Sequence, residues 1–334
     1  LESADIAWNA DASRVTRGTA RMRLADGTID LKLEGRLAPE RAPDRPDELR
    51  LGADLEVSGE LRGASLEAGR DLLRDIYGHV RRTGYDPESA RAEDAGPLWK
   101  NQFFASDLYR GLIAGTRLRL RMAVRDALPA GSLPPELAIT GRLDNGYLRL
   151  ESENGGFAPD RPEFQLKYES NLNAILPRQD LQLRLRVPQN QIAFPELTAT
   201  DTPPASLNIS FLMGGEGLLP GDLMQRTYSR LDVKTGPIRF GRNRLLNIIR
   251  HEAQQSGEDL TMPALDLTRS TDGSASTLRL RTGDPGNVMI DGSGENVAGL
   301  GGQLTLRFRY PADPGANRSL RFRIDANGGY VPEL

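Results

Sequence analysis

The sequence predicts a mainly β protein of the β-rich α+β class. We expect twisted antiparallel sheets in an elongated or two-lobed arrangement, with about three amphipathic helices packed on the sheets. Three observations lead to this prediction: short runs that alternate apolar with polar residues, turn dipeptides between such runs, and three segments with helical spacing.

Alternating runs occur from one end of the chain to the other, and their polar residue is usually arginine. Five examples span residues 117–122, 181–187, 277–281, 304–310 and 320–324. A period of two places every apolar side chain on one face of a sheet and every charge on the other. The chain is therefore expected to build half-buried antiparallel sheets, each with one wet and one apolar face.

The N-terminal region predicts a meander. Strands at 21–24 and 28–37 flank Asp26-Gly27, a dipeptide that favours a tight hairpin turn. Residues 37–48 hold three prolines among mixed charges and are expected to form a loop. Alternation resumes at 49–61.

Three segments change to helical spacing. Residues 65–82 predict an amphipathic helix with Ser65 as its candidate N-cap. Residues 98–114 predict a second helix with Gly115 as its C-cap, and a third is predicted at about 242–255.

The remaining chain returns to strands. Asn145-Gly146 is the strongest hairpin signal in the sequence, and a glycine-rich segment spans 292–302. The order of elements suggests an N-terminal β lobe (1–200) with two helices and a C-terminal β lobe (201–334) with one. The other predicted strands are 116–125, 137–143, 147–152, 164–168, 181–187, 207–211, 264–269, 276–281, 287–291, 303–310 and 319–325.

Composition excludes several classes of protein. A net charge of −3 and a pI near 5.7 argue against a nucleic-acid binder. The chain has no cysteine, which excludes disulfides, thiolate nucleophiles and cysteine metal sites. No apolar stretch approaches the roughly 18 to 20 residues that cross a bilayer. Because the chain opens at Leu1 without a methionine and runs early into strand-like sequence, we expect a fragment whose leader or membrane anchor was removed.

No motif indicates a metal, a cofactor or a catalytic site. His79 and His251 are expected on helix surfaces; His251-Glu252 begins like a zinc-protease motif, but Gln255 stands where the second histidine belongs. Residues 291–296 could hold calcium through oxygen ligands, although turn chemistry explains the same composition. A glycoside hydrolase would need two convergent carboxylates, and the sequence offers no such pair.

The helix predicted at 98–114 is the least ordinary segment because it concentrates aromatic residues. Packing of this helix on a sheet is one interpretation, and the other is a helix that lines or gates an apolar cleft between sheets. On the second interpretation the candidate ligand-binding residues are Trp99, Phe103, Phe104 and Leu108.

The element order over 55–114 resembles that of the YdgA-type (DUF945-like) bacterial envelope proteins. The resemblance rests on residues 56–61 (EVSGEL), the helix at 65–82, a polar link, and the Phe103-Phe104 helix that leads into a strand at Thr116. The strand–Asp-Gly–strand piece at 24–29 (LADGTI) is similar to those of the AsmA-like superfamily. The resemblance implies a membrane-anchored protein with a β-rich body in the Gram-negative periplasm, in a group that includes members implicated in phospholipid movement between membranes.

These observations lead to a first hypothesis: a non-enzymatic periplasmic envelope protein whose apolar sheet face binds or conducts a lipid or other apolar ligand and so supports cell-envelope maintenance. The alternative is a structural or assembly protein of the envelope that acts through protein–protein contacts. An enzyme acting on envelope polysaccharide is a third hypothesis. Expected partners are a lipid and other envelope proteins, with no nucleic acid, no cofactor, and membrane association through a segment absent from this chain.

Overall fold

The structure is a computed structural model, and it describes most of the chain outside the connecting segments. The candidate residues Trp99, Phe103, Phe104 and Leu108 lie outside the described residues, as does the helix predicted at 65–82. The described ranges are 3–9, 14–24, 27–42, 45–63, 113–126, 133–134, 137–153, 161–173, 178–190, 205–216, 227–240, 244–255, 260–273, 275–283, 288–297, 301–310, 313–325 and 330–333.

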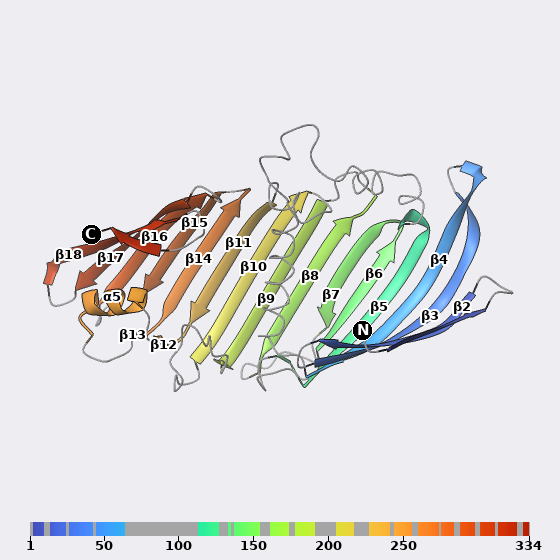
Figure 1. The fold of residues 1–334 in the computed structure, drawn as a ribbon, viewed down its shortest axis with the longest axis horizontal. Helices are drawn as coiled ribbons and strands as arrows, with labels where there is room; N and C mark the ends of the chain where they lie inside the picture. The colour runs from blue at the N-terminus through green and yellow to red at the C-terminus, as the bar shows by residue number, and fades with distance from the viewer. Residues whose placement is uncertain are drawn as a thin grey trace. The chain divides into compact units, whose positions relative to one another are not determined.

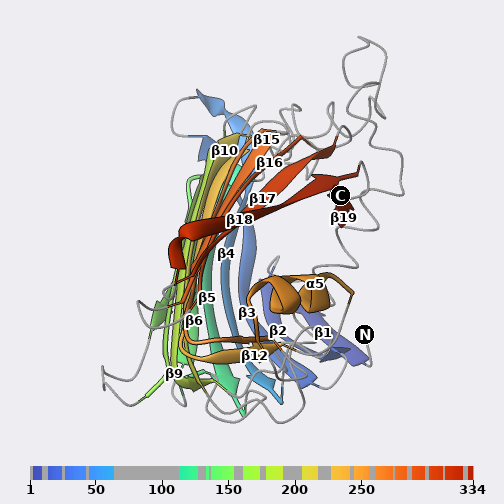
Figure 2. The same cartoon turned by 90° about the vertical axis from the view of Figure 1, so that its left-hand side faces the viewer.

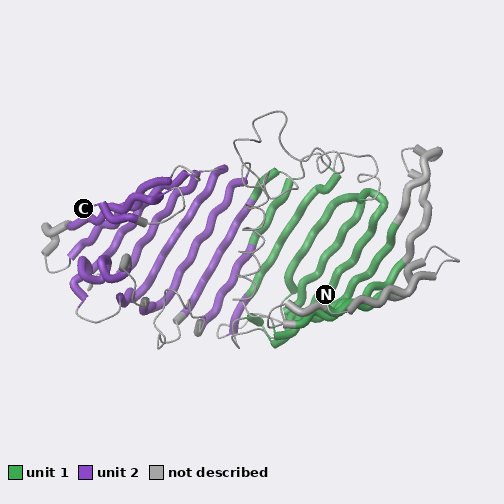
Figure 3. The backbone as a smooth tube through the Cα atoms, in the orientation of Figure 1, with its two compact units in different colours: residues 1–157, 164–182, 214–226 green, residues 158–163, 183–213, 227–334 purple. Residues whose placement is uncertain are grey.

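The prediction of a mainly β, mostly antiparallel protein is confirmed (Figure 1). The chain forms two compact units (Figure 3). The lobe boundary near residue 200 stays a prediction. Unit 1 comprises residues 1–157, 164–182 and 214–226, and unit 2 comprises residues 158–163, 183–213 and 227–334.

In unit 1, strands β1 to β8 pair in chain order. Each of these pairings is antiparallel except that of β4 with β5, which is parallel. The long segment between β4 and β5 supplies the crossover that a parallel pair requires. The strands are β1 (Ser3–Asn9), β2 (Arg14–Leu24), β3 (Gly27–Ala42), β4 (Arg45–Arg62), β5 (Thr116–Arg125), β6 (Leu137–Asp144), β7 (Tyr147–Glu153) and β8 (Glu163–Asn171).

The loop predicted at 37–48 is wrong, because β3 continues to Ala42 and β4 begins at Arg45. In the described pairings, β2 meets β3 only as far as Leu33, and β5 meets β4 only from Ala53. Beyond those points the described β3 and β4 pair only with each other. Proline lacks an N–H and is tolerated where a strand has a free side, so the prolines do not break this two-stranded ribbon.

The hairpin predicted at Asn145-Gly146 is confirmed. Both residues have positive φ, 49° and 76°, as a two-residue type I′ turn requires, and Asp144 pairs with Tyr147 across it. The Asn173 side-chain amide donates to the Asn145 carbonyl at 2.5 Å, which ties the next turn to this one.

In unit 2, β11 pairs with β14, and β14 to β19 then pair antiparallel in chain order, while β12 and β13 form a separate two-stranded sheet. Strands β9 and β10 contribute residues to both units. The elements are β9 (Arg178–Asn190), β10 (Ala205–Glu216), β11 (Thr227–Thr235), β12 (Ile238–Phe240), α5 (Arg244–Glu252), β13 (Leu260–Met262), β14 (Leu265–Asp272), β15 (Ala275–Thr282), β16 (Met289–Val297), β17 (Gly301–Tyr310), β18 (Asp313–Ile324) and β19 (Tyr330–Glu333).

The glycine-rich segment at 292–302 does not form a separate connection. Residues 292–297 complete β16, and β17 begins at Gly301. A Cβ at Gly292 would lie 2.9 Å from Leu306 Cδ2, and one at Gly294 would lie 3.2 Å from Leu304 Cδ1. These glycines make room for leucines on the apolar face, so the turn predicted for 291–296 is also wrong.

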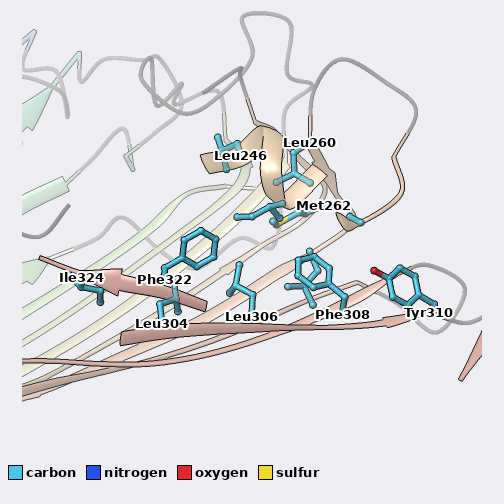
Figure 4. Close-up of a cluster of buried hydrophobic side chains, with 12 residues drawn as sticks. Leu246, Leu260, Met262, Leu304, Leu306, Phe308, Tyr310, Phe322 and Ile324 are labelled. Atoms are coloured by element: carbon cyan, nitrogen blue, oxygen red, sulfur yellow. The ribbon is translucent and has the colours of Figure 1, made fainter. Parts of the chain in front are cut away.

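The third predicted helix is confirmed as α5, which lies on one side of the strands β16–β18 (Figure 2). Phe308 and Phe322 of the sheet are fully buried beneath it, at 0% exposure (Figure 4). In the described residues no helix has the length and apolarity to cross a membrane. The core of unit 2 joins α5, β13 and the sheet through Leu246, Ile249, Ala253, Leu260, Met262, Ile290, Leu304, Leu306, Phe308, Tyr310, Phe322 and Ile324.

The C-terminus of α5 is fixed in a Schellman motif. Gln254 has a φ of 55°, its N–H bonds to the His251 carbonyl, and the Gln255 N–H bonds to the Arg250 carbonyl at 3.2 Å. The Gln255 side chain brackets the Thr261 backbone of β13, with bonds of 2.7 and 2.8 Å. The Tyr310 hydroxyl donates to the Glu252 carbonyl at 2.6 Å. The helix, the two-stranded sheet of β12 and β13, and the larger sheet are thus joined by hydrogen bonds as well as by the core.

Candidate apolar binding face

The candidate site of unit 1 is the apolar face of strands β3 to β8. Register places the apolar residues of these strands side by side in two central rows, which we call the apolar rows. The first row runs Leu33, Val57, Leu120, Gly141, Leu150 and Tyr168, and the second runs Leu31, Gly59, Met122, Ile139 and Ser152.

Every residue of the apolar rows is only half-buried. Residues beside them on the same face are better covered: Val124 is 5% exposed, Leu137 2% and Leu143 7%. The accessible apolar surface therefore includes both central rows, while part of the margin at β5 and β6 is covered. Contiguous apolar surface of this kind normally marks a binding or interaction site.

Two glycines shape the apolar rows. A Cβ at Gly59 would lie 2.8 Å from Leu31 Cδ2, and a Cβ at Gly141 would lie 2.6 Å from Leu150 Cδ2. The neighbouring leucines lean over the glycines, so the rows form a continuous apolar surface at these points.

Polar groups lie at the β8 end of the rows. The Tyr168 hydroxyl donates to Gln179 Oε1 at 3.1 Å, and burial raises the pKa of Tyr168 above its usual value. Ser170, beside them, is 1% exposed, and its Oγ has no hydrogen-bond partner among the described residues. Ser152 accepts a bond from the Leu166 N–H at 2.8 Å and donates to the Phe164 carbonyl at 3.2 Å. This end of the face can therefore meet a polar atom as well as an apolar chain.

The opposite, polar face of unit 1 carries several ion pairs. Glu60 contacts Arg62 at 2.6 Å and Arg125 at 2.7 Å, and Arg142 contacts Asp144 at 2.7 Å. The Arg62 guanidinium, assisted by Arg125, holds the pKa of the Glu60 carboxyl below its usual range. These ion pairs are exposed and contribute little to stability, but they leave this face without a strong net charge.

The structure also shows where His251 and Asp291, which the sequence analysis considered as metal ligands, are placed. His251 lies on the surface of α5 with its side chain 82% exposed, as expected. Asp291 lies in β16 and pairs with Arg281 at 3.6 Å and with Arg309, so its carboxylate serves charge pairing on a sheet. No group of three metal-ligating side chains occurs in the part of the chain that the structure describes.

Residues 113–115 are helical and lead directly into β5, and the rest of the helix predicted at 98–114 lies outside the described residues. The helix includes Gly115, one residue beyond the predicted end. The roles predicted for Trp99, Phe103, Phe104 and Leu108 stay predictions. Sequence reasoning concentrated on these aromatics and did not single out the apolar rows, because cross-strand neighbours depend on register.

Comparison of the chain with models of protein families, with curated proteins and with solved structures finds no match. The resemblance to the YdgA-type and AsmA-like envelope proteins therefore stays a prediction.

Proposed function

We propose that the protein is a non-enzymatic envelope protein of the periplasm whose apolar rows in unit 1 hold the acyl chain of a lipid. The proposal rests on one observation: the apolar rows are contiguous across β3 to β8 and every member keeps part of its surface accessible. Burial of that surface against a hydrocarbon chain is favourable by about 25 cal/mol per Å².

The arrangement of polar groups supports a lipid over a wholly apolar ligand. Tyr168, Ser170 and Gln179 gather at one end of the rows, while the centre offers only aliphatic side chains. A ligand with a polar head and an apolar tail matches both parts, because a buried hydroxyl gains most from a partner it otherwise lacks.

Native mass spectrometry of the protein purified from cells tests this proposal. We expect lipid to co-purify with the wild type and to be lost from Leu120→Glu, which places a charge in the first apolar row. Arg119→Gln is the matched control, because Arg119 precedes Leu120 in β5 and its side chain lies on the polar face. Lipid retained by both variants, or absent from the wild type, would contradict the proposal.

A second candidate function, an assembly or scaffolding role through protein contacts, is favoured by unit 2. There Phe308 of β17 and Phe322 of β18 lie under α5 and β13 and have no surface left for a ligand. If a partner protein covers the apolar rows of unit 1, Leu120→Glu will abolish a stable complex and leave lipid content unchanged.

A further inference from the structure

The polar face of β15 to β19 in unit 2 differs in charge from the polar face of unit 1. Its described side chains include twice as many arginines as carboxylates. The arginines are Arg279, Arg281, Arg307, Arg309, Arg321 and Arg323, and the carboxylates are Asp291, Glu295 and Glu333. On the polar face of β2 to β8 the described charges balance. The cations are Arg21, Lys32, Arg62, Arg117, Arg119, Arg121, Arg125, Arg142, Arg149 and Lys167, and the carboxylates are Asp30, Glu34, Asp54, Glu56, Glu60, Asp144, Glu151, Glu153, Glu163 and Glu169.

The side chains of four of the six arginines on this face form neither an ion pair nor a hydrogen bond within the described residues. They are Arg279, Arg307, Arg321 and Arg323, and all four are exposed. We call them the arginine patch. The other two, Arg281 and Arg309, share the single carboxylate of Asp291. A guanidinium group that forms no ion pair can donate hydrogen bonds to an external anion.

Register brings part of the arginine patch together with hydroxyl groups. Arg307 lies opposite Ser319 and Arg321 lies opposite Thr305, so the two arginines are diagonal neighbours on adjacent strands. Diagonal neighbours of this kind are about 7–8 Å apart at the backbone and are within reach of one ligand through long side chains. Two guanidinium groups and two hydroxyl groups therefore surround one point between β17 and β18, a combination that suits a phosphate group. On their other sides Arg307 lies opposite Asp291 of β16, and Arg321 lies opposite Glu333 of β19.

We infer that the arginine patch docks on a bilayer that contains anionic phospholipid. A bilayer presents many phosphate groups on one broad surface, and an anionic surface potential attracts each nearby arginine. No aromatic residue lies among the described positions of this face. Its apolar side chains lie at the margins: Val331 in β19, opposite Arg323, and Ala275, Met289 and Val297 at the ends of their strands. Protein interfaces and single-stranded nucleic-acid sites usually centre on aromatic or apolar anchors, and the described middle of this face, in β16 to β18, has none.

The inference goes beyond the proposed function, because it concerns the polar face of unit 2 and requires no acyl chain to leave the bilayer. Vesicle co-sedimentation at low salt tests it directly. We expect the wild type to sediment with vesicles of equal parts phosphatidylcholine and phosphatidylglycerol, and not with pure phosphatidylcholine. Removal of each arginine should weaken binding about fivefold, so Arg307→Gln with Arg321→Gln should weaken it roughly 30-fold.

Two matched double variants distinguish binding through the arginine patch from binding through positive charge elsewhere on the protein. Arg142→Gln with Arg149→Gln removes the same charge from the polar face of unit 1, where both arginines are ion-paired, and should leave vesicle binding unchanged. Arg307→Lys with Arg321→Lys keeps the charge and should retain most of the binding. Equal losses in the two glutamine pairs, no binding to anionic vesicles, or equal binding to both vesicle types would overturn the inference. So would tight binding to an acidic protein or to single-stranded DNA with none to vesicles.

Vesicle binding also stays distinct from the proposed lipid cargo. Leu120→Glu should lose co-purified lipid and keep vesicle binding, whereas the double glutamine variant of the arginine patch should show the reverse. Loss of vesicle binding in Leu120→Glu would show that the apolar rows, and not the arginine patch, hold the protein to the bilayer.

Discussion

Two apolar sheet faces with the same alternating sequence pattern differ in how deeply they are buried in this protein. In unit 2, residues of β17 and β18 lie under α5 and β13, and Phe308 and Phe322 have no exposed surface. In unit 1, the apolar rows of β3 to β8 stay half-buried along their whole length. Alternation alone thus specifies a sheet with one apolar face. Whether that face becomes core or binding surface depends on whether another element covers it.

The largest effect is expected in the sealed face. Phe308→Ala should lower the free energy of unfolding of unit 2 by about 3–5 kcal/mol, because it removes a fully buried ring and leaves a cavity under α5. Hydrogen–deuterium exchange with mass spectrometry should show faster exchange for the amides of β17 and β18. An unchanged exchange rate there would mean that α5 does not seal this face.

A matched leucine pair compares the two faces with the same chemistry. Leu306→Ala, at 3% exposure, should cost about 2–5 kcal/mol. Leu120→Ala, in the first apolar row, should cost only about 1 kcal/mol, because its side chain keeps part of its surface in contact with water. Urea unfolding of the two variants measures the difference. Equal losses would show that the two faces are equally packed.

The end of the covering helix gives a smaller, stabilising prediction. Gln254 has a φ of 55°, a left-handed conformation that glycine adopts without a Cβ penalty. Gln254→Gly should therefore raise the free energy of unfolding by about 0.5–1 kcal/mol, since α5 keeps its closing hydrogen bonds and loses the strain. Thermal melts of Gln254→Gly and Asn247→Gly test this prediction. Asn247 is exposed within α5, so glycine there should lower the melting temperature slightly, whereas glycine at position 254 should raise it.

The smallest effect depends on pH and concerns Asp232 in β11. A hydrogen bond from Arg230 lowers the pKa of its carboxyl below the usual value, assisted by the Thr268 hydroxyl at 2.7 Å and opposed by partial burial. A lowered pKa means that the carboxylate stabilises the fold above about pH 4, where the unfolded group is also ionised, and that this contribution fades as pH falls further.

Asp232→Asn should accordingly lower the melting temperature at neutral pH, and the gap from the wild type should close below about pH 4. Melting curves recorded across the acid range measure this closure. A gap that stays constant down to the most acid pH would mean that the charge of Asp232 plays no part.

Much of the fold was predictable because its signals are local. Asn145-Gly146 requires only two residues to specify a turn, and the spacing of Leu246 and Ile249 is enough to indicate α5. The predictions were wrong where the role of a proline or glycine depends on the neighbouring strand and not on the local sequence. The prolines at 37–48 predicted a loop, although a ribbon with free sides accepts them, and Gly292 predicted a turn, although it makes space for Leu306.

The candidate sites were less predictable than the fold. Each arginine of the arginine patch has the spacing of an ordinary solvated strand residue, and only register shows that Arg307 and Arg321 are diagonal neighbours on adjacent strands. Register likewise brings Leu33, Leu120 and Leu150 into one row from strands far apart in the sequence. A single sequence contains the strands but not their alignment.

The difference between an open and a sealed apolar face can be measured by single-cysteine labelling, because the chain has no cysteine of its own. Leu120→Cys should react rapidly with a maleimide and be protected by added phospholipid, Leu306→Cys should react only on unfolding, and Arg119→Cys should react rapidly with or without lipid. If Leu120→Cys reacts as slowly as Leu306→Cys in lipid-free protein, or if phospholipid does not slow it, then the apolar rows do not hold an acyl chain.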